Sequence, residues 1–408
     1  MELVLRARAS LKKKGLFSAS RIKGQDVVQA LLDAMEGTPL EAHARARGRG
    51  PDGPFNVHLH PHGGRIEIRV NGDQVEFETL TFAVGPGYHA FLVSLLDSMQ
   101  PSLGLQWEWL DPTDYARRKD FADLESRMAQ RFREICADLA QRIKKAQGSG
   151  GGAKLCLPDD FSVVARKGEI FTPFGPIGFE QLERWASLDG EELRSAAAGL
   201  SLWWDQDFGG SFYYGLVLYS LWMEIRWATP LDKEEADFII GVLEWYSSAL
   251  EHHVDLPIAQ SAITELFALV EGKLARPIAD PRGLGYRRRD WTRSIGKNWR
   301  LVMPGCLEET EAENDSTYVF TADRLDVRAS VYDAPSDDPR VRAGEFDGEI
   351  AVNTQYVEKL DRTFTVRNLA KTHPLGERTS ICIMTITSST PETDLIGERI
   401  GKSLTYVT

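Results

Sequence analysis

The chain has 408 residues, of which 42% are hydrophobic and 26% are charged, and its formal net charge is −12. A chain of this length exceeds the size at which one hydrophobic core usually stops growing, so two or three domains are expected. The composition is typical of globular proteins and excludes disorder of the whole chain. The acidic balance argues against binding to nucleic acid or to an anionic membrane, because both reward clustered Lys and Arg.

The cysteines and the N-terminal residues indicate the compartment. The chain has four cysteines: Cys136, Cys156, Cys306 and Cys382. They are widely scattered and form no CxxC pair, so neither a disulfide framework nor a cysteine zinc site is predicted. Residues 1–17 lack the apolar stretch and cleavage site of a signal peptide. The most apolar run, residues 212–223, is shorter than the roughly 20 residues that cross a bilayer. We therefore expect a cytoplasmic protein that binds no membrane.

Residues 1–175 are predicted to form an α+β domain. Residues 55–60, 65–70 and 74–82 alternate apolar and polar side chains, and Asn71-Gly72 is a strong hairpin signal. Apolar residues then recur at helical spacing over residues 88–99. This pattern predicts an antiparallel sheet with covering helices.

A long amphipathic helix is predicted next. Asp111 reads as its N-cap and Pro112 as its first helical residue. Apolar side chains keep three- and four-residue spacing as far as Ile143, so one helical face packs and the other is solvated.

The remaining chain is expected to have three parts. Residues 176–276 show helical periodicity and are rich in Trp, which we assign to core packing because each indole buries much apolar area. Residues 277–296 are rich in Gly and Arg and are predicted to be a linker. Residues 297–408 are acidic and β-rich, with a closing helix from Pro391. The predicted class is α+β: an N-terminal antiparallel sheet, a helical middle and a C-terminal α/β sandwich.

The last quarter of the chain resembles a known fold. The strand Trp299–Pro304 leads into an acidic stretch, a hairpin, a late apolar strand and a terminal amphipathic helix. This order of elements resembles the PsbP-like α/β sandwich, which also occurs in a Ran-binding protein and in bacterial chaperones of secreted Rhs effectors. By fold analogy the resemblance implies a binding domain more than an enzyme, and it carries over no functional residue.

The segment Gly85-Pro86-Gly87-Tyr88-His89-Ala90 is the first candidate site. It follows a predicted strand and opens a helix, so formally it matches the GxGxxA fingerprint of dinucleotide-binding proteins. The preceding strand is half polar, and Pro86 removes one backbone N–H from a phosphate cradle. The alternatives are a plain strand-to-helix turn and an anion held at the helix N-terminus beside His89. Gly85, Gly87 and His89 are the candidate ligand-binding residues.

His58 and His60 are the second candidate site. Residues two apart on a strand share a face, so this pair could contribute to a metal site. Zinc needs three or four ligands, and local spacing ties no carboxylate or cysteine to the pair. The alternative is two exposed or hydrogen-bonded strand histidines.

The sequence contains no GxSxG elbow, P-loop or HExxH motif. The leading interpretation is a non-catalytic protein-interaction factor without a cofactor: an adaptor, specialised chaperone or immunity-type protein of bacterial type. Its expected partner is another protein, bound through the acidic C-terminal domain or the helical middle. The alternative is an enzyme or ligand sensor with a nucleotide, anion or metal site at the Gly85 to Ala90 turn and the His58/His60 strand.

Overall fold

The computed structural model describes residues 3–10, 23–48, 53–146, 153–157, 161–166, 168–200, 208–252, 260–274, 283–310, 317–345, 348–357 and 362–408. The chain forms two compact units. The first comprises Met1–Leu157, Lys167–Tyr219 and Glu244–Pro257, and the second comprises Pro158–Arg166, Ser220–Leu243 and Ile258–Thr408. Helices and antiparallel sheets occur in both units, which confirms the predicted α+β class.

The first unit is built on a six-stranded sheet in the order β2-β3-β4-β5-β1-β6, with every neighbouring pair antiparallel. The strands are β1 (Val4–Ser10), β2 (Arg45–Gly48), β3 (Phe55–His58), β4 (Ile66–Asn71), β5 (Gln74–Leu80) and β6 (Trp107–Leu110). Asn71 pairs with Gln74, so the predicted hairpin is confirmed. Together with α1 (Gly24–Asp33) and α2 (Pro86–Leu103), strands β1, β4, β5 and β6 have the β-α-β-β-α-β connectivity of a ferredoxin-like fold.

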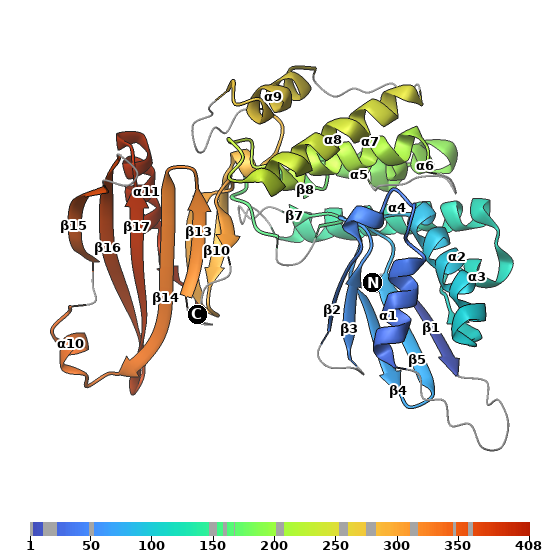
Figure 1. Ribbon diagram of the computed structural model, residues 1–408, viewed down its shortest axis with the longest axis horizontal. Coiled ribbons are helices and arrows are strands. Elements are labelled where there is room, and N and C mark those ends of the chain that lie inside the picture. The colour runs from blue at the N-terminus through green and yellow to red at the C-terminus, as the bar shows by residue number, and fades with distance from the viewer. Residues whose placement is uncertain are drawn as a thin grey trace. The chain divides into compact units, whose positions relative to one another are not determined.

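The two faces of this sheet differ because the side chains alternate along each strand. Leu5, Ala7 and Phe77 are buried on the face that α1 and α2 cover (Figure 1). Arg6 and Arg8 point to the opposite face, where they form ion pairs with Glu78 and Glu76 across to β5. These exposed pairs stabilise the sheet only slightly, whereas burial of the apolar face is the main favourable contribution.

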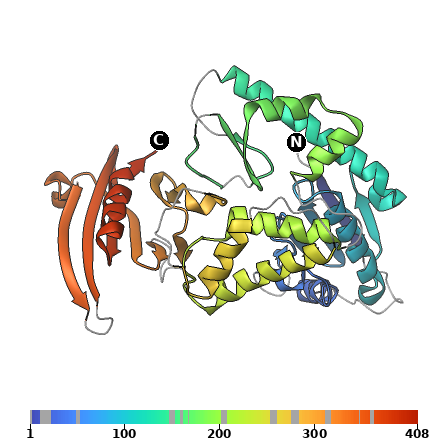
Figure 2. The same cartoon turned by 90° about the horizontal axis from the view of Figure 1, so that it is seen from above.

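The helix predicted to begin at Asp111 begins later. The residues after Asp111 form a turn and the short helix α3 (Tyr115–Arg118), and the long helix α4 (Phe121–Lys145) is capped by Asp120, whose side chain accepts the N–H of Asp123. Two further helices, α5 (Phe179–Ser187) and α6 (Gly190–Ala198), lie along α4 (Figure 2). A small sheet formed by β7 (Ala153–Lys154), β8 (Glu169–Thr172) and β9 (Gly175–Gly178) precedes α5.

The helical segments predicted between residues 179 and 270 are present. Beyond α5 and α6 they are α7 (Gly210–Tyr219), a π-helical turn at Ser220–Glu224, α8 (Lys233–Glu251) and α9 (Gln260–Val270). These helices are divided between the two units. Trp203 and Trp204 lie outside the described residues.

Part of the segment predicted to be a linker, residues 277–296, forms a strand. Residues 290–295 form β10 (Asp290–Ile295), which pairs with β11 (Trp299–Pro304). Trp291 and Ile295 are buried, and the guanidinium of Arg293 lies 4.5 Å from the ring centroid of Trp291. The arginines that resembled a solvated linker therefore pack on aromatic rings, where their stems bury apolar surface.

Buried arginines also join helical segments of the second unit to its β-strands. Arg226 is fully buried and is paired with Glu235, and it donates to the carbonyl oxygen of Thr229 at 2.9 Å. Arg287 donates to the carbonyl oxygen of Met223 at 2.9 Å. Burial, followed by repulsion from Arg293, lowers the pKa of Arg287 to about 10, so the guanidinium stays charged at neutral pH.

The C-terminal part of the second unit contains two sheets. One has the order β10-β11-β18, and the other has the order β12-β13-β14-β17-β16-β15. The additional elements are β12 (Glu308–Thr310), β13 (Thr317–Ala322), β14 (Leu325–Pro335), α10 (Pro339–Arg342), β15 (Gly348–Val357), β16 (Arg362–Leu375), β17 (Arg378–Ser388), α11 (Pro391–Ser403) and β18 (Thr405–Tyr406). The predicted closing helix is α11, and it packs against β17, β11 and β14 over a core that includes Trp299 and Phe320 (Figure 1).

Candidate functional site

His89 lies at the start of α2 and is hydrogen-bonded at both ring nitrogens. Its Nδ1 is 2.9 Å from Oγ1 of Thr81, at the end of β5. Its Nε2 is 3.2 Å from Oδ2 of Asp111 and 3.3 Å from Oγ1 of Thr113. The His89 and Asp111 side chains are almost completely buried. His89 therefore joins the end of β5, the start of α2 and the turn after β6.

Asp111 is held as a charged carboxylate. Its oxygens accept hydrogen bonds from the backbone N–H of Thr113 at 2.8 Å and of Ala116 at 2.9 Å. Burial by itself would raise the pKa of Asp111, but the hydrogen bonds from His89, Ala116 and Thr113 outweigh burial and hold the pKa well below its usual range. Each acceptor oxygen has a donor from the fold itself, which is typical of a structural network.

Gly85 and Gly87 form a buried strand-to-helix turn. Gly85 has φ +94° at the N-cap of α2, a conformation that favours glycine, and Pro86 is the first helical residue. The N–H of Gly85 donates to the carbonyl oxygen of Thr81 at 3.0 Å. Gly85, Pro86, Gly87 and Tyr88 are all buried. Strand β5 is antiparallel to both of its neighbours, unlike the first strand of a dinucleotide-binding domain. Dinucleotide binding here stays a prediction.

His58 and His60 differ in environment. His58 is the exposed last residue of β3, whereas His60 lies beyond the strand and is buried. Burial and the neighbouring Arg47, Arg65 and Arg45 lower the pKa of His58; these cations would also oppose a bound metal ion. Within the described ranges, no group of three or more His, Cys, Asp or Glu side chains could hold a metal ion. A metal bound by this pair stays a prediction.

Three histidines form a cluster: His60 and His62 are buried, and His43 is partly buried beside them. The Nδ1 of His60 accepts the backbone N–H of His62 at 3.1 Å. The ring of His62 lies 4.8 Å from that of Tyr219 in α7, and the ring of His43 lies 5.1 Å from that of Trp245 in α8. The Nε2 atoms of His43 and His62 are buried without a hydrogen-bond partner.

The histidines of this cluster are uncharged at neutral pH. Burial lowers the pKa of His62 to about 4, and burial together with Arg45 lowers the pKa of His43 to about 4. Burial, with His62 and His43 next, puts the pKa of His60 well below its ordinary value. Neutral imidazoles are able to pack among aromatic rings, whereas buried imidazolium ions would need compensating carboxylates.

The thiols are poor candidates for a nucleophile. Burial raises the pKa of Cys156 and of Cys382 to about 12, and it raises the pKa of Cys136 as well. Because the thiolate is the reactive form, these side chains are unreactive at neutral pH.

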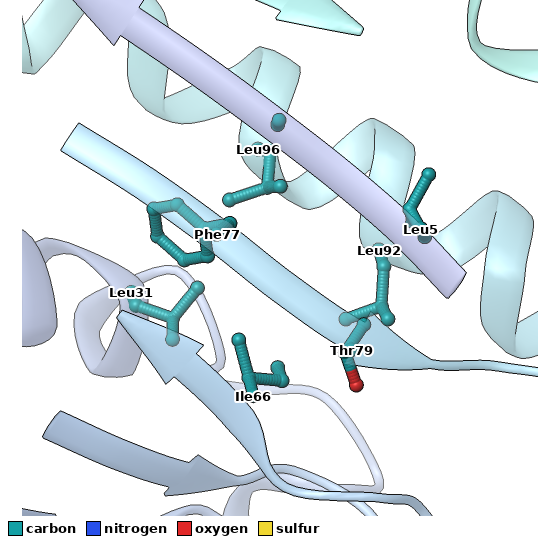
Figure 3. A pocket seen from close by; sticks show the side chains of 8 residues that line it. Leu5, Leu31, Ile66, Phe77, Thr79, Leu92 and Leu96 are labelled. Carbon is teal, nitrogen blue, oxygen red and sulfur yellow. The ribbon is translucent and has the colours of Figure 1, made fainter. Parts of the chain in front are cut away.

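A small void lies between the sheet and helices α1 and α2 of the first unit (Figure 3). Its volume is about 10 Å³ and its lining is apolar apart from Thr79. The Oγ1 atom of Thr79 is buried without a hydrogen-bond partner. Because this volume corresponds to about one water molecule, the void is a packing defect and not a ligand pocket.

An edge strand with exposed apolar side chains belongs to the second unit. Strand β15 is ten residues long and lies at one edge of the six-stranded sheet, where it pairs with β16. Every described side chain from Val352 to Tyr356 is exposed, with Val352 at 43% and Tyr356 at 58% of full accessibility. Unpaired N–H and C=O groups at such an edge are a template for pairing with another chain.

No family model matches the chain, and no curated protein matches it. A solved structure from Bacteroides thetaiotaomicron VPI-5482 aligns with 28% of this chain and 50% of its own, at 12% identity and a TM-score of 0.20. A likeness at this TM-score carries no argument about fold or function. The resemblance to the PsbP-like sandwich stays a prediction. Among the described residues, no helix is long and apolar enough to cross a membrane.

Proposed function

We propose that the chain is a non-catalytic protein-interaction factor, of the adaptor, specialised chaperone or immunity type, and that β15 is its docking edge. The proposed partner contributes an extended segment that pairs with β15 as an added strand. In this mode of recognition, backbone hydrogen bonds supply affinity and alternate side chains supply specificity. The observation that carries the proposal is the exposure of every side chain from Val352 to Tyr356 in β15.

The sequence of β15 supports this interpretation. Edge strands are commonly protected from pairing by Lys, Pro or a short length. Strand β15 is ten residues long, and its sequence GEIAVNTQYV contains neither Lys nor Pro. Val352, Thr354 and Tyr356 alternate along it and so share one face. An added strand would cover this apolar and hydroxyl-bearing row.

Photo-crosslinking in the native host tests the proposal. A photoreactive phenylalanine analogue replaces Tyr356 in the full chain, and a matched chain carries it at Leu395, an exposed residue of α11 with 67% accessibility. We expect a discrete crosslinked partner from position 356 and none from position 395. The partner is then purified, and its affinity for the full chain is measured.

Substitutions at the same strand give the second readout. Val352→Lys with Tyr356→Lys should weaken binding of the purified partner at least tenfold, because lysines protect an edge from pairing. Leu395→Lys should leave the affinity unchanged. Binding that is equally tight in the double variant, or a crosslink that forms equally from both positions, would overturn the proposal.

Point substitutions in β15 test the docking edge better than a deletion of residues 301–408 would. The second unit also contains Pro158–Arg166 and Ser220–Leu243. A deletion would remove most of β11, the strand that pairs with β10 of the same unit. Loss of binding would then report unfolding as readily as loss of the docking edge.

A ligand sensor that uses the cluster of His43, His60 and His62 is the second candidate function. The observation that favours it is the buried pair of ring nitrogens, Nε2 of His43 and Nε2 of His62, that lack hydrogen-bond partners. Such a site predicts bound metal by elemental analysis, or a rise in melting temperature with zinc or a nucleotide. Occupancy at about 100 times the dissociation constant would add about 2.7 kcal/mol to the free energy of unfolding. Absence of both effects would exclude this candidate.

A further inference from the structure

One edge of the six-stranded sheet of the first unit carries several positively charged side chains. Strand β2 lies at this edge, and all four of its residues are exposed. Arg45 pairs across the strands with His58, and Arg47 pairs with Asn56. Arg65, just before β4, is also exposed. We call Arg45, Arg47, His58 and Arg65 the β2 basic edge.

The three arginines of this edge lie close to His58. The pKa of His58 is lowered first by its partial burial and then by Arg47, Arg65 and Arg45. Three guanidinium groups therefore act on one imidazole. The edge has a clustered positive potential, although the whole chain has a net charge of −12.

The arginines of the β2 basic edge differ from the other arginines of this sheet face. Arg6, Arg8 and Arg69 are each paired with a glutamate. For Arg45, Arg47 and Arg65, no carboxylate among the described residues lies within ion-pair distance. Within the described part of the chain these donors have no carboxylate partner, and arginine binds carboxylates in a two-pronged geometry.

We infer that the β2 basic edge binds an acidic, extended segment of a partner protein by strand addition. The segment would pair with the outer backbone groups of β2, and carboxylates at every second residue would face Arg45 and Arg47. Charge complementarity selects the acidic peptide as occupant. The backbone edge favours a polypeptide over a nucleic acid, which has no strand to add. This surface is separate from β15 and does not depend on the function proposed for β15.

The experiment uses the full chain and a fluorescein-labelled, N-acetylated peptide of alternating Glu and Val. A matched peptide has Gln in place of Glu, and a labelled single-stranded DNA serves as a second anionic probe. Fluorescence anisotropy is measured at low and at physiological salt. We expect the Glu peptide to bind, to weaken as salt rises, and to bind more tightly than the Gln peptide or the DNA. Hydrogen exchange should show protection of the amides of residues 45–48.

Two charge-reversal variants locate the site. Arg45→Glu with Arg47→Glu should reduce the affinity for the Glu peptide at least tenfold. Lys145→Glu, at an exposed position near the end of α4, is the control and should bind as the unmodified chain does. Circular dichroism checks that both variants are folded.

Several results would overturn the inference: equal affinity in the double variant, equal binding of the Gln peptide, or tighter binding of the DNA. Failure of the Glu peptide to bind at low salt would also overturn it. In that case the arginines serve only to protect an exposed edge from self-association. None of these results bears on the crosslinking at Tyr356, so the two proposals fail independently.

Discussion

The Nε2 atom of His89 lies 3.2 Å from the Oδ2 atom of Asp111, and both side chains are buried. The pair closes a network in which the carboxylate also receives the backbone N–H groups of Thr113 and Ala116. Removing one partner of a buried charged network costs more than removing an exposed ion pair, because the remaining polar groups lose their partners without regaining water.

Asp111→Asn should therefore lower the free energy of unfolding by about 3 kcal/mol. The measurement is urea denaturation at pH 7, followed by circular dichroism. Asp114→Asn is the matched control, since Asp114 is paired with Arg117 at the surface, and it should leave the urea midpoint nearly unchanged. Equal effects of the two substitutions would contradict the assignment of Asp111 to a structural network.

The buried histidines predict a loss of stability in acid. The pKa values of His43 and His62 are about 4 in the folded chain, against an ordinary value of 6.5. Between these values the unfolded chain binds more protons, so stability is complete above pH 6.5 and falls as the pH drops toward 4. Each of these two histidines should lower the free energy of unfolding by about 2 kcal/mol at pH 5.

The pH dependence is measured by urea denaturation at pH 7.0, 6.0 and 5.0. In His62→Gln the free energy of unfolding should fall less between pH 7 and pH 5 than in the unmodified chain. This expectation holds for any effect of the substitution on stability at pH 7. An unchanged loss in this variant would show that His62 is not the buried neutral group that its surroundings indicate.

Substitution by Val at Thr79 and at Thr113 should change the free energy of unfolding in opposite directions. The Oγ1 of Thr79 is buried without a partner, so Thr79→Val should raise the free energy of unfolding by about 1 kcal/mol. The Oγ1 of Thr113 donates to Asp111 at 2.7 Å, so Thr113→Val should lower it by about 1 to 2 kcal/mol. Chemical denaturation of both variants gives the comparison, and the same sign for both would refute it.

Gly285 should tolerate no side chain. It has φ +105°, and an added Cβ would lie 2.2 Å from Nε1 of the buried Trp227. Gly72 has φ +66° in the hairpin turn, but an added Cβ there would meet open space. We expect Gly72→Ala to lower the free energy of unfolding by about 1 kcal/mol and Gly285→Ala to lower it by clearly more. Thermal unfolding followed by tryptophan fluorescence measures the difference.

Sequence patterns predicted elements well where one face is buried. The alternation on β4 and β5, the turn at Asn71-Gly72 and the apolar stripe of α11 all correspond to elements of the structure. Strands β15 and β16 were not predicted. The side chains from Val352 to Tyr356 in β15 are exposed on both faces, so neither face requires apolar residues at every second position. The segment Thr363 to Val366 carried a weak alternation that could have indicated β16.

The candidate site was predicted less well because its contacts are tertiary. Asp111 had the local signal of an N-cap, but its side chain binds His89, which is 22 residues away in the sequence. The alternation of residues 55–60 suggested that His58 and His60 share a strand face, yet the chain leaves β3 after His58. His60 and His62 are two residues apart, but His43 precedes His60 by 17 residues and joins the cluster only through tertiary structure.

The interleaved composition of the two units has a consequence for biosynthesis. The second unit takes its first segment from Pro158–Arg166, but Tyr286 and Trp291, whose rings pack against Phe161, are synthesised roughly 125 residues later. At about 5 to 20 residues per second, that first segment waits on the order of 6 to 25 seconds for these partners. Phe161 and Val163, which are buried in the finished structure, are exposed to the cell during this interval. A nascent chain stalled before residue 283 should therefore depend on a holding chaperone more than the completed protein does.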